Sequence, residues 1–361
     1  MKKVIFISAL AIAAAVSCTK SDIVDTKFNE QIGFESYIGR AAQTKATVID
    51  NGNIDEETIG LYGFYTGANP WKIGDEKDVA GAIDNPTPNL WDGDALAYDE
   101  TKGWYTEESK YWTNASDYYS FLAYAPLATE TNGLTATTTA NPTVTYTDPV
   151  TVEGKGITDQ IDLLYAVPVF NCQRGEDPTP KAVGLTMKHA LSRIAIKAKE
   201  DHDDYTYTIT GLSLSGTFVQ EKTFSLVESK WVEDGAKTGA TTYNFVVENN
   251  AVTIDKTVSA DYVSCVGEEY LMIIPTAVTE AILTVTYKTT YGTDGNEVIS
   301  AEIEKEVKIS ETFVQGKAYT INLTFEPNAS EEIKFTVDVA LWDEVKDGAT
   351  VETPVDKTIE A

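Results

Sequence analysis

Residues 32–39, IGFESYIG, alternate in a way that is typical of a β-strand with one buried face. Ile32, Phe34 and Ile38 would lie on one face of that strand, together with Ser36. Because three large apolar side chains on one face have to leave water, the strand must belong to a hydrophobic core. The stretch therefore predicts that the folded part of the chain begins with a buried strand.

Short strand-like segments of the same kind follow along the rest of the chain, separated by turns rich in Gly, Pro, Asn and Asp. Nineteen Tyr, abundant Thr and Val, and only three Met favour β-structure over helix bundles. Many short strands separated by such turns predict an all-β fold made of antiparallel β-sandwiches. The clearest segments are IGLYGFYTG (59–67), YYSFLAYAPL (118–127), IDLLYAVPVF (161–170), YTYTITGLSLSG (205–216), AILTVTYKTTY (281–291) and AYTINLTF (318–325).

The length of the chain suits two domains, since about 340 residues remain after the export signal described below. The polar, proline-containing stretch QRGEDPTPK at residues 173–181 is the best candidate for their junction. We therefore expect two β-sandwich domains in tandem, one over residues 41–180 and one over residues 181–361.

Two local patterns refine this expectation. The alternation of residues 183–189 shifts phase near Ser192, which predicts a bulge or a bent strand. Asp294 and Gly295 both tolerate positive φ, and they stand between two strand-like segments. They predict a tight hairpin turn.

The first eighteen residues, MKKVIFISALAIAAAVSC, have the pattern of a bacterial lipoprotein export signal. Lys2 and Lys3 supply the charged start, and small residues precede Cys18. The apolar middle, residues 4–16, would form a helix of about 20 Å, which is too short to cross roughly 30 Å of hydrocarbon. A cleaved signal is therefore favoured over a membrane-spanning helix.

We expect residues 1–17 to be removed and the new N-terminal residue, Cys18, to be acylated. Acyl chains such as palmitate would then hold the precursor on the outer membrane. Residues 18–40 would form a polar tether followed by the first strand.

The chain is strongly acidic, with a formal net charge of −28 at pH 7. After removal of Lys2 and Lys3, 26 basic residues remain against 56 acidic residues, a net charge of −30. Because phosphate recognition requires positive charge, nucleic acid is excluded as a partner. The acidity is better suited to a soluble surface that resists nonspecific association.

Residues that catalyse reactions or hold metal ions are scarce in this sequence. His189 and His202 lie at no zinc-ligand spacing from any cysteine. The sequence has no GxSxG elbow, no P-loop and no HExxH, and its acidic clusters match no EF-hand loop. We therefore expect no enzymatic activity, no catalytic residue, no cofactor and no metal site.

Two internal cysteines, Cys172 and Cys265, lie far apart in the sequence. An exported protein is permitted to form a disulfide bond between them. Two buried free thiols agree with the sequence equally well, because a single pair defines no disulfide framework.

Aromatic residues cluster between residues 91 and 119. Exposed rings stack on sugars, so the cluster would suit a glycan-binding surface. Packing within the sheets explains most of these rings as well, and we favour that interpretation. The members are Trp91, Trp104, Tyr105, Tyr111, Trp112, Tyr118 and Tyr119.

Arg40 directly follows the first strand and precedes a stretch of small and polar residues. A protease that cuts after basic residues would find such a site accessible. Cleavage between Arg40 and Ala41 would discard Cys18 and the strand together, and Lys45 is the second choice of site. An ordinary surface charge is the alternative interpretation of Arg40.

In their order along the chain, these features resemble the fimbrillins of Bacteroidetes, the major and minor subunits of type V pili. The resemblance covers most of the chain and includes the lipoprotein signal. It rests further on IGFESYIGR (32–40), IGLYGFYTG (59–67), DLLYA (162–166), VGLTMKHALSRIAI (183–196) and GKAYTINLTF (316–325).

The resemblance implies two transthyretin-like β-sandwich domains and assembly at the cell surface. In that family a trypsin-like surface protease removes the anchored segment, here the strand with Ile32, Phe34 and Ile38. The groove that remains has unpaired backbone groups, and a C-terminal strand of a neighbouring subunit fills it. The expected partners are therefore other pilus subunits, the protease, and the outer membrane before processing. The expected product is a fimbrium.

IKFTVDVAL, at residues 333–341, is a candidate for that donor strand. Its apolar positions alternate with less apolar ones. The tail at residues 342–361 is an equal candidate, and a strand that completes its own domain is the other interpretation. The apolar positions are Ile333, Phe335, Val337, Val339 and Leu341.

A second function class competes with the pilus subunit. The chain would then stay on the outer membrane as an anchored lipoprotein and bind glycan through exposed aromatic residues. Arg40 favours the processed subunit, because a permanent anchor needs no cleavage site. The sequence does not separate stalk, tip and anchor roles.

Overall fold

The computed structural model describes residues 30–38, 49–74, 81–177, 179, 181–200, 205–255, 261–266, 270–292, 298–326, 333–342 and 355–356. Regular structure in these ranges is nearly all β-strand, so the all-β class is confirmed. Its helices are single 3-10 turns, and no helix in these ranges is long and apolar enough to cross a membrane. The turns are η1 (Ile54–Glu56), η2 (Pro149–Thr151), η3 (Ile157–Asp159) and η4 (Glu248–Asn250).

The first sheet has eight strands in the order β2-β3-β4-β1-β10-β8-β5-β9. Because β2 also pairs with β5, seven of these strands close into a ring of pairings, which we call the N-terminal ring. Its strands are β1 (Gly33–Ile38), β2 (Ile59–Gly67), β3 (Trp91–Asp99), β4 (Gly103–Thr106), β5 (Tyr118–Ala125), β8 (Leu164–Ala166) and β10 (Ala182–His189), and β9 (Val169–Cys172) pairs with β5 outside it.

The second sheet has six strands and is built on the parallel pair of β11 and β21. β22 pairs with β21 on the other side and carries β23 at the edge. The strands are β11 (Ser192–Glu200), β16 (Val263–Ser264), β17 (Leu271–Ile273), β21 (Lys317–Phe325), β22 (Ile333–Leu341) and β23 (Val355–Asp356).

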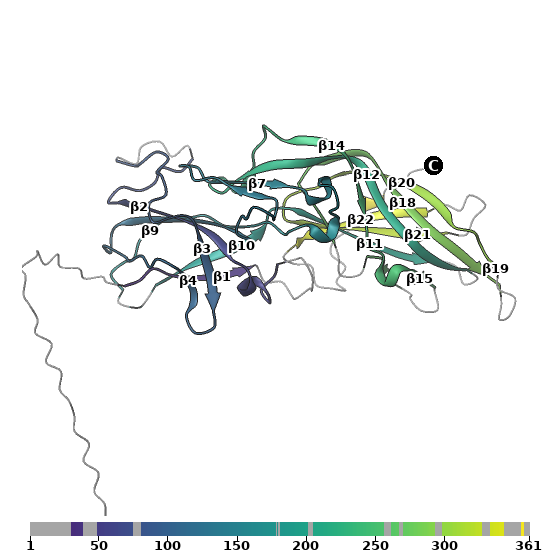
Figure 1. Cartoon of the computed structure of the whole chain (residues 1–361), viewed down its shortest axis with the longest axis horizontal. Coiled ribbons are helices and arrows are strands. Elements are labelled where there is room, and N and C mark those ends of the chain that lie inside the picture. Colours follow the sequence, from purple (N-terminus) through teal and green to yellow (C-terminus); the bar gives the residue numbers. More distant parts are fainter. Residues whose placement is uncertain are drawn as a thin grey trace, which may run out of the picture.

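The third sheet has nine strands and is organised by the long strand β12, which spans Tyr205–Ser225. The far end of β12 pairs with β7, so a segment from the first half of the chain enters a sheet of the second half. Figure 1 shows β12, β18 and β20 running side by side toward one end of an elongated molecule. The other strands are β6 (Leu134–Ala136), β7 (Thr143–Thr147), β13 (Lys230–Trp231), β14 (Lys237–Asn244), β15 (Val252–Ile254), β18 (Ala277–Tyr291), β19 (Val298–Ile299) and β20 (Ile303–Thr312).

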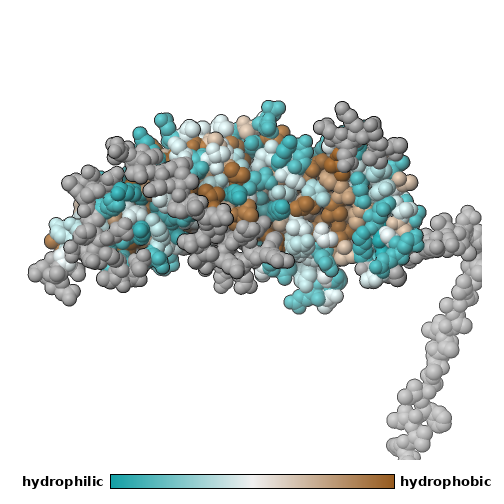
Figure 2. Space-filling view, turned by 180° about the vertical axis from the view of Figure 1, so that it is seen from behind, coloured by the Kyte–Doolittle hydropathy of each residue, from teal (hydrophilic) through white to brown (hydrophobic). Residues whose placement is uncertain are grey.

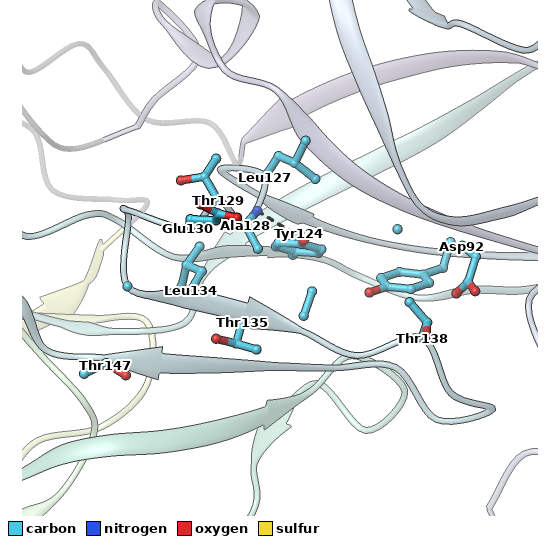
Figure 3. A pocket seen from close by; sticks show the side chains of 14 residues that line it. Asp92, Tyr124, Leu127, Ala128, Thr129, Glu130, Leu134, Thr135, Thr138 and Thr147 are labelled. Atoms are coloured by element: carbon cyan, nitrogen blue, oxygen red, sulfur yellow. Dashed lines mark hydrogen bonds between the residues drawn. The ribbon is translucent and has the colours of Figure 1, made fainter.

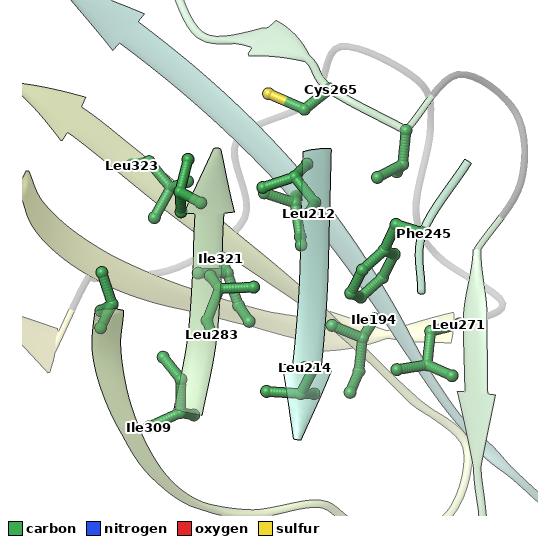
Figure 4. Packing of buried hydrophobic residues seen from close by; sticks show 14 of the residues in the cluster. Ile194, Leu212, Leu214, Phe245, Cys265, Leu271, Leu283, Ile309, Ile321 and Leu323 are labelled. Carbon is green, nitrogen blue, oxygen red and sulfur yellow. The ribbon is translucent and has the colours of Figure 1, made fainter. Parts of the chain in front are cut away.

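Three clusters of buried apolar residues follow one another along the molecule. The N-terminal ring encloses the first, around Phe34, Trp91 and Phe121. The second, which we call the central cluster, lies where the sheets meet and contains Tyr62 of β2 as well as Trp342, which directly follows β22. The third, which we call the C-terminal core, fills the space between the six-stranded and nine-stranded sheets, where Ile194, Leu212, Leu283 and Ile321 converge (Figure 4).

The phase shift near Ser192 is a change of sheet, and the predicted bulge or bent strand is therefore wrong. β10 ends at His189 within the N-terminal ring, and β11 begins at Ser192 within the six-stranded sheet. The two residues between them, Ala190 and Leu191, are fully buried in the central cluster. The apolar face changes because each strand covers a different core. The turn predicted at Asp294 and Gly295 lies outside the described residues.

Cys172 and Cys265 are both free thiols, which resolves the choice that the sequence left open. Burial raises the pKa of the Cys265 thiol to about 12, so this side chain stays protonated and unreactive at neutral pH. Cys172 is half-buried on β9.

On the face seen in Figure 2, hydrophobic areas show between hydrophilic ones. Large apolar side chains with substantial exposure occur on several strands. They include Tyr37 on β1, Tyr98 on β3, Ile299 on β19, and both Val339 and Leu341 on β22.

Candidate functional site

β1 is an internal strand of the N-terminal ring, with a paired strand on each side. It pairs in parallel with β10 through six residues, from Gly33 opposite Ala182 to Ile38 opposite Met187. On its other side it pairs antiparallel with β4, where Phe34 stands opposite Trp104. Backbone bonds continue this side: the N–H of Ile32 donates to the carbonyl of Lys110 over 2.8 Å. The strand therefore has neighbours on both edges.

The inner face of β1 is apolar, as its alternation indicates. Ile32, Phe34 and Ile38 are exposed by only 2%, 7% and 2%. The ring of Phe34 meets Trp91 and Phe121 edge-on, with ring centres 5.5 Å and 5.6 Å apart. We call the space that β1 fills, between β10 and β4 and over these rings, the β1 groove.

Glu30 fixes the start of β1 through two donors. Its carboxylate accepts a bond from Nε of Arg174 over 2.7 Å and from the backbone N–H of Lys181 over 2.7 Å. Arg174 is 4% exposed, and its other nitrogens donate to the carbonyls of Asp177 and Thr179 over 2.6 Å and 2.9 Å. The residues predicted to be a domain junction therefore form a carboxylate-binding loop. We call Arg174 and the N–H of Lys181 the carboxylate seat.

Asn51 fixes the end of β1. Its side-chain oxygen accepts from the backbone N–H of Ile38 over 2.7 Å, and its amide nitrogen donates to the carbonyl of Ile38. Next to it, the N–H of Ile49 donates to the carboxylate of Asp162 over 3.0 Å. Both flanks of residues 39–48 are thereby attached to the folded protein.

The predicted processing residues Arg40, Ala41 and Lys45 fall within residues 39–48, outside the residues that the structure describes. The predicted lipidation residue, Cys18, also lies outside them. The structure places the end of β1 two residues before Arg40.

β22, the candidate donor strand, pairs with β21 through nine residues, from Ile333 opposite Phe325 to Leu341 opposite Lys317. Only part of its predicted apolar face is buried. Phe335 and Val337 belong to the C-terminal core and are each 7% exposed, Ile333 is half-buried, and Val339 and Leu341 are 38% and 42% exposed. Val339 and Leu341 belong to none of the three clusters of buried residues.

Trp342 anchors the end of β22 within the central cluster. Its ring stacks on His189 with ring centres 4.1 Å apart and planes inclined by 2°. The guanidinium group of Arg193 lies 5.6 Å from the Trp342 ring. His189, in turn, has Nδ1 3.0 Å from a carboxylate oxygen of Asp162. A displacement of β22 would therefore disturb this buried stack.

A separate cavity of about 550 Å³ lies beside β2 and β5, where Asp92 and Thr138 stand at one end and Glu130 near the other (Figure 3). Burial raises the pKa of both Tyr62 and Tyr124, so these phenols remain protonated at neutral pH. Burial also raises the pKa of Asp92. Across the described ranges, no group of three or more His, Cys, Asp or Glu side chains could hold a metal ion.

The aromatic cluster is mainly structural. Trp91, Trp112 and Tyr119 are at most 2% exposed and pack inside the N-terminal ring. Trp104 is half-buried and packs edge-on against Tyr98 at 5.5 Å. Few of these rings are therefore open to a sugar.

Sequence reasoning missed the polar residues at both ends of β1. Glu30 was part of an apparently featureless tether, Asn51 stood in a turn, and Arg174 stood in an apparent linker. The rarity of arginine was the one available signal, because Arg174 and Arg193, two of only three arginines, are both buried.

Comparisons with known proteins agree with the fold. A family model described as fimbrillin-like matches residues 44–342. A fimbrial protein from Bacteroides vulgatus superposes with a TM-score of 0.66 at 19% identity, covering 87% of this chain and all of that protein.

Two further solved structures are less similar. A proposed cell adhesion protein from Bacteroides uniformis has a TM-score of 0.47 at 20% identity, over 86% of this chain and 99% of that one. The fimbrial anchor protein Mfa2 from Porphyromonas gingivalis has a TM-score of 0.31 at 12% identity, over 86% and 98%. No curated protein matches the chain.

Proposed function

The chain belongs to the fimbrillin-like family, and from this premise we propose that it is a structural and adhesive subunit of a surface fimbria assembled by strand exchange. The observation that supports this most directly is the position of β1. It is a near-terminal strand that fills a gap between β10 and β4, and its chain continues directly toward Arg40. One cut there separates the strand from the rest of the ring.

We propose the following route to the surface. The chain is exported as a lipoprotein, and lipid on Cys18 holds the precursor on the outer membrane. A trypsin-like surface protease then cuts between Arg40 and Ala41, or after Lys45, and releases residues 18–40 with β1. The lipid anchor and the strand leave together, so detachment from the membrane coincides with opening of the groove.

Loss of β1 would leave an exposed apolar groove and unpaired backbone groups, so binding of a replacement strand would be strongly favoured. Three side chains buried at about 1.5–3 kcal/mol each represent roughly 5–9 kcal/mol of apolar burial. The backbone edges of β10 and β4 also lose their partner. A strand from a second subunit would restore both contributions, and such head-to-tail contacts form a filament because they do not close on themselves.

We further propose that the chain forms two transthyretin-like domains in tandem. The strand pairings support a boundary after His189 better than one at residue 180, because β10 pairs with β1 and β8 of the ring. β7 is the exception, since it pairs with β12 of the second half. The central cluster with Trp342 would then be the interface between the two domains.

Cleavage at the proposed site is tested with the double variant Arg40→Ala, Lys45→Ala. The wild-type precursor should give a ladder of polymers after treatment with a trypsin-like protease, and protein from sheared filaments should begin at Ala41 or Ala46. The double variant should stay monomeric, whereas the single variant Lys45→Ala should polymerise like wild type. Polymerisation of the double variant at the wild-type level would refute the processing step.

The alternative, an anchored glycan-binding lipoprotein, has less support. Trp91 and Trp112 are buried, so the aromatic surface on which it rests is reduced to rings such as Tyr98, Trp104 and Tyr111. Fatty-acid labelling of surface protein separates the two functions. A mature protein that keeps the label on Cys18 throughout growth would favour the anchored alternative.

A further inference from the structure

We propose that the carboxylate seat selects and aligns the incoming strand, and that its occupant in the filament is Asp347 of a second copy, with residues 347–355 of that copy in the β1 groove. This inference rests on the proposed strand exchange and specifies its register. It assigns Arg174 a role in specificity. Its first support is that the seat is built by residues that cleavage does not remove.

Arg174 is held in place by its own loop. Two of its nitrogens donate to the carbonyls of Asp177 and Thr179, while Nε points to Glu30. Glu30 lies N-terminal to the cleavage site, so it leaves with β1, whereas Arg174 and Lys181 remain. Arg174 also interacts electrostatically with Asp177, which stays after cleavage, but the two donors that bonded Glu30, Nε of Arg174 and the N–H of Lys181, lose their carboxylate. A strand that brings a carboxylate to this point is therefore favoured over one that does not.

The side-chain pattern of β1, the strand that cleavage removes, is the pattern that we expect in the strand that replaces it. Glu30 is followed by large apolar residues two, four and eight positions later, and by Ser36 at position six. After Trp342 only one acidic residue begins such a series. The series is Asp347, Ala349, Val351, Thr353 and Val355, which places an acid, three apolar residues and a hydroxyl in the same order as in β1.

β22 offers the same pattern, because Glu331 is followed by Ile333, Phe335 and Val339. It is already committed, however, to nine pairings with β21 and to the stack of Trp342 on His189. The tail is attached far more weakly in the described residues: β23 pairs with β22 only at Val355 and Asp356. Among the described residues, release of the tail breaks the two pairings of β23, whereas release of β22 breaks its nine pairings with β21 and those two as well.

The proposed register makes the new strand parallel to β10. Thr350 of the second copy would stand opposite Ala182, as Gly33 does in the precursor, and Val355 opposite Met187. Ala349 and Val351 are smaller than Ile32 and Phe34, so they fill the groove less completely. Pro354 would stand opposite Thr186 and has no N–H to donate to the ladder. The carboxylate therefore carries a larger share of the selectivity than it does for β1.

Binding of a synthetic peptide tests the seat without requiring filaments. Peptides covering residues 345–357 are added to the processed subunit, with the natural sequence or with Asp347→Asn. A charge-assisted hydrogen bond of ordinary strength predicts binding about 10- to 100-fold weaker for the substituted peptide. A Glu352→Gln peptide is the matched control and should bind like the natural one, since Glu35 at that position of β1 is exposed. Equal affinity of the natural and the Asp347→Asn peptides would overturn the proposal.

Polymerisation of full-length precursors gives the second measurement. After processing, Asp347→Asn should assemble at least tenfold more slowly than wild type, and Glu331→Gln should assemble at the wild-type rate. The opposite ranking would assign the groove to β22 and overturn the proposal. If the natural peptide binds and depends on Asp347 but wild-type precursor forms no polymer, strand exchange between copies fails as a function while the seat stands.

The register is tested by disulfide formation between copies. Thr350→Cys combined with Ala182→Cys should cross-link processed subunits, whereas Thr350→Cys combined with Gly184→Cys should not. Each single cysteine variant controls for reaction with the half-buried Cys172. Cross-linking through residue 184 in place of residue 182 would overturn the register.

Discussion

β1 and β22 carry similar apolar patterns, yet the structure uses them differently. β1 buries Ile32, Phe34 and Ile38 and has neighbours on both edges, but it has only six parallel pairings and one antiparallel ladder pairing. β22 leaves Val339 and Leu341 exposed by more than a third, but it has nine continuous pairings. β1 thus buries more of its large side chains, whereas β22 has the longer continuous pairing.

Under the proposed strand exchange, a strand would be replaceable because of how it is attached, and its apolar content alone would not decide the matter. Polar residues close both ends of β1, with Arg174 at its start and Asn51 at its end. Each is a discrete contact that another strand with suitable groups can reproduce. The end of β22 is a buried ring stack that involves Trp342 and has no such simple substitute.

The largest expected effect on stability comes from substituting the buried phenylalanine of each strand, Phe34 in β1 and Phe335 in β22. Phe34→Ala and Phe335→Ala each delete a buried ring and should lower the free energy of unfolding of the precursor by about 3–5 kcal/mol. Denaturant unfolding measures both. After processing and release of β1, the Phe34 variant should unfold like wild type, because the residue has left, while the Phe335 variant should stay destabilised. A persistent defect in the processed Phe34 variant would contradict the removal of β1.

An intermediate effect on stability is expected from substituting Glu30 at the start of β1. Glu30→Gln removes the charge at the carboxylate seat and should destabilise the precursor by about 1.5–3 kcal/mol. Hydrogen exchange should show this loss as faster exchange of the β1 amides, with little change in β22. Glu35→Gln on the exposed face is the control, and its exchange pattern should match that of wild type. Equal protection of β1 in both variants would show that the seat does not hold the strand.

The smallest expected effect is on the pH dependence of stability and comes from Asp148, which lies outside both strands and serves as a reference. Burial raises the pKa of Asp148, although Tyr243 and Gln160 donate hydrogen bonds to its carboxylate. The native protein therefore binds this proton more tightly than the unfolded chain, whose aspartates titrate near pH 4. The resulting stabilisation is complete below about pH 4 and is lost as pH rises through the raised native pKa.

Asp148→Asn, which stays neutral, should remove this part of the pH dependence. Unfolding curves recorded from pH 3 upward measure it. Because Asp148 lies away from β1, the difference between wild type and variant should be the same before and after processing. A difference that changes with processing would mean that removal of β1 alters more than the N-terminal ring.

The alternation of apolar and polar residues predicted the strands well, because a strand with one buried face can be recognised from residues that are adjacent in the sequence. Ile32, Phe34 and Ile38 were identified in this way, as were Phe335 and Val337. Closure of the N-terminal ring depends on β2 meeting both β3 and β5, and such long-range pairing leaves no local signal. The change of sheet at Ser192 was misread for the same reason, since a phase shift is equally compatible with a bulge.

The ends of β1 could not be predicted from the sequence because their partners are remote. Arg174 contacts Glu30 across 144 positions of sequence, within a stretch whose Pro and Asp content is typical of a linker. Lys181 contributes only its backbone N–H, which every residue except proline possesses. A carboxylate site built in this way becomes visible only when the fold brings its parts together.

The parallel alignment of β1 with β10 has a directional consequence for any assembly that reuses the groove. If each occupant repeats the orientation of β1, parallel to β10, every joint has the same polarity. Such a chain of subunits has two unlike ends, an open groove at one and an unused tail at the other. Growth and termination would therefore require different molecules, and a subunit whose groove cannot be opened would cap one end only.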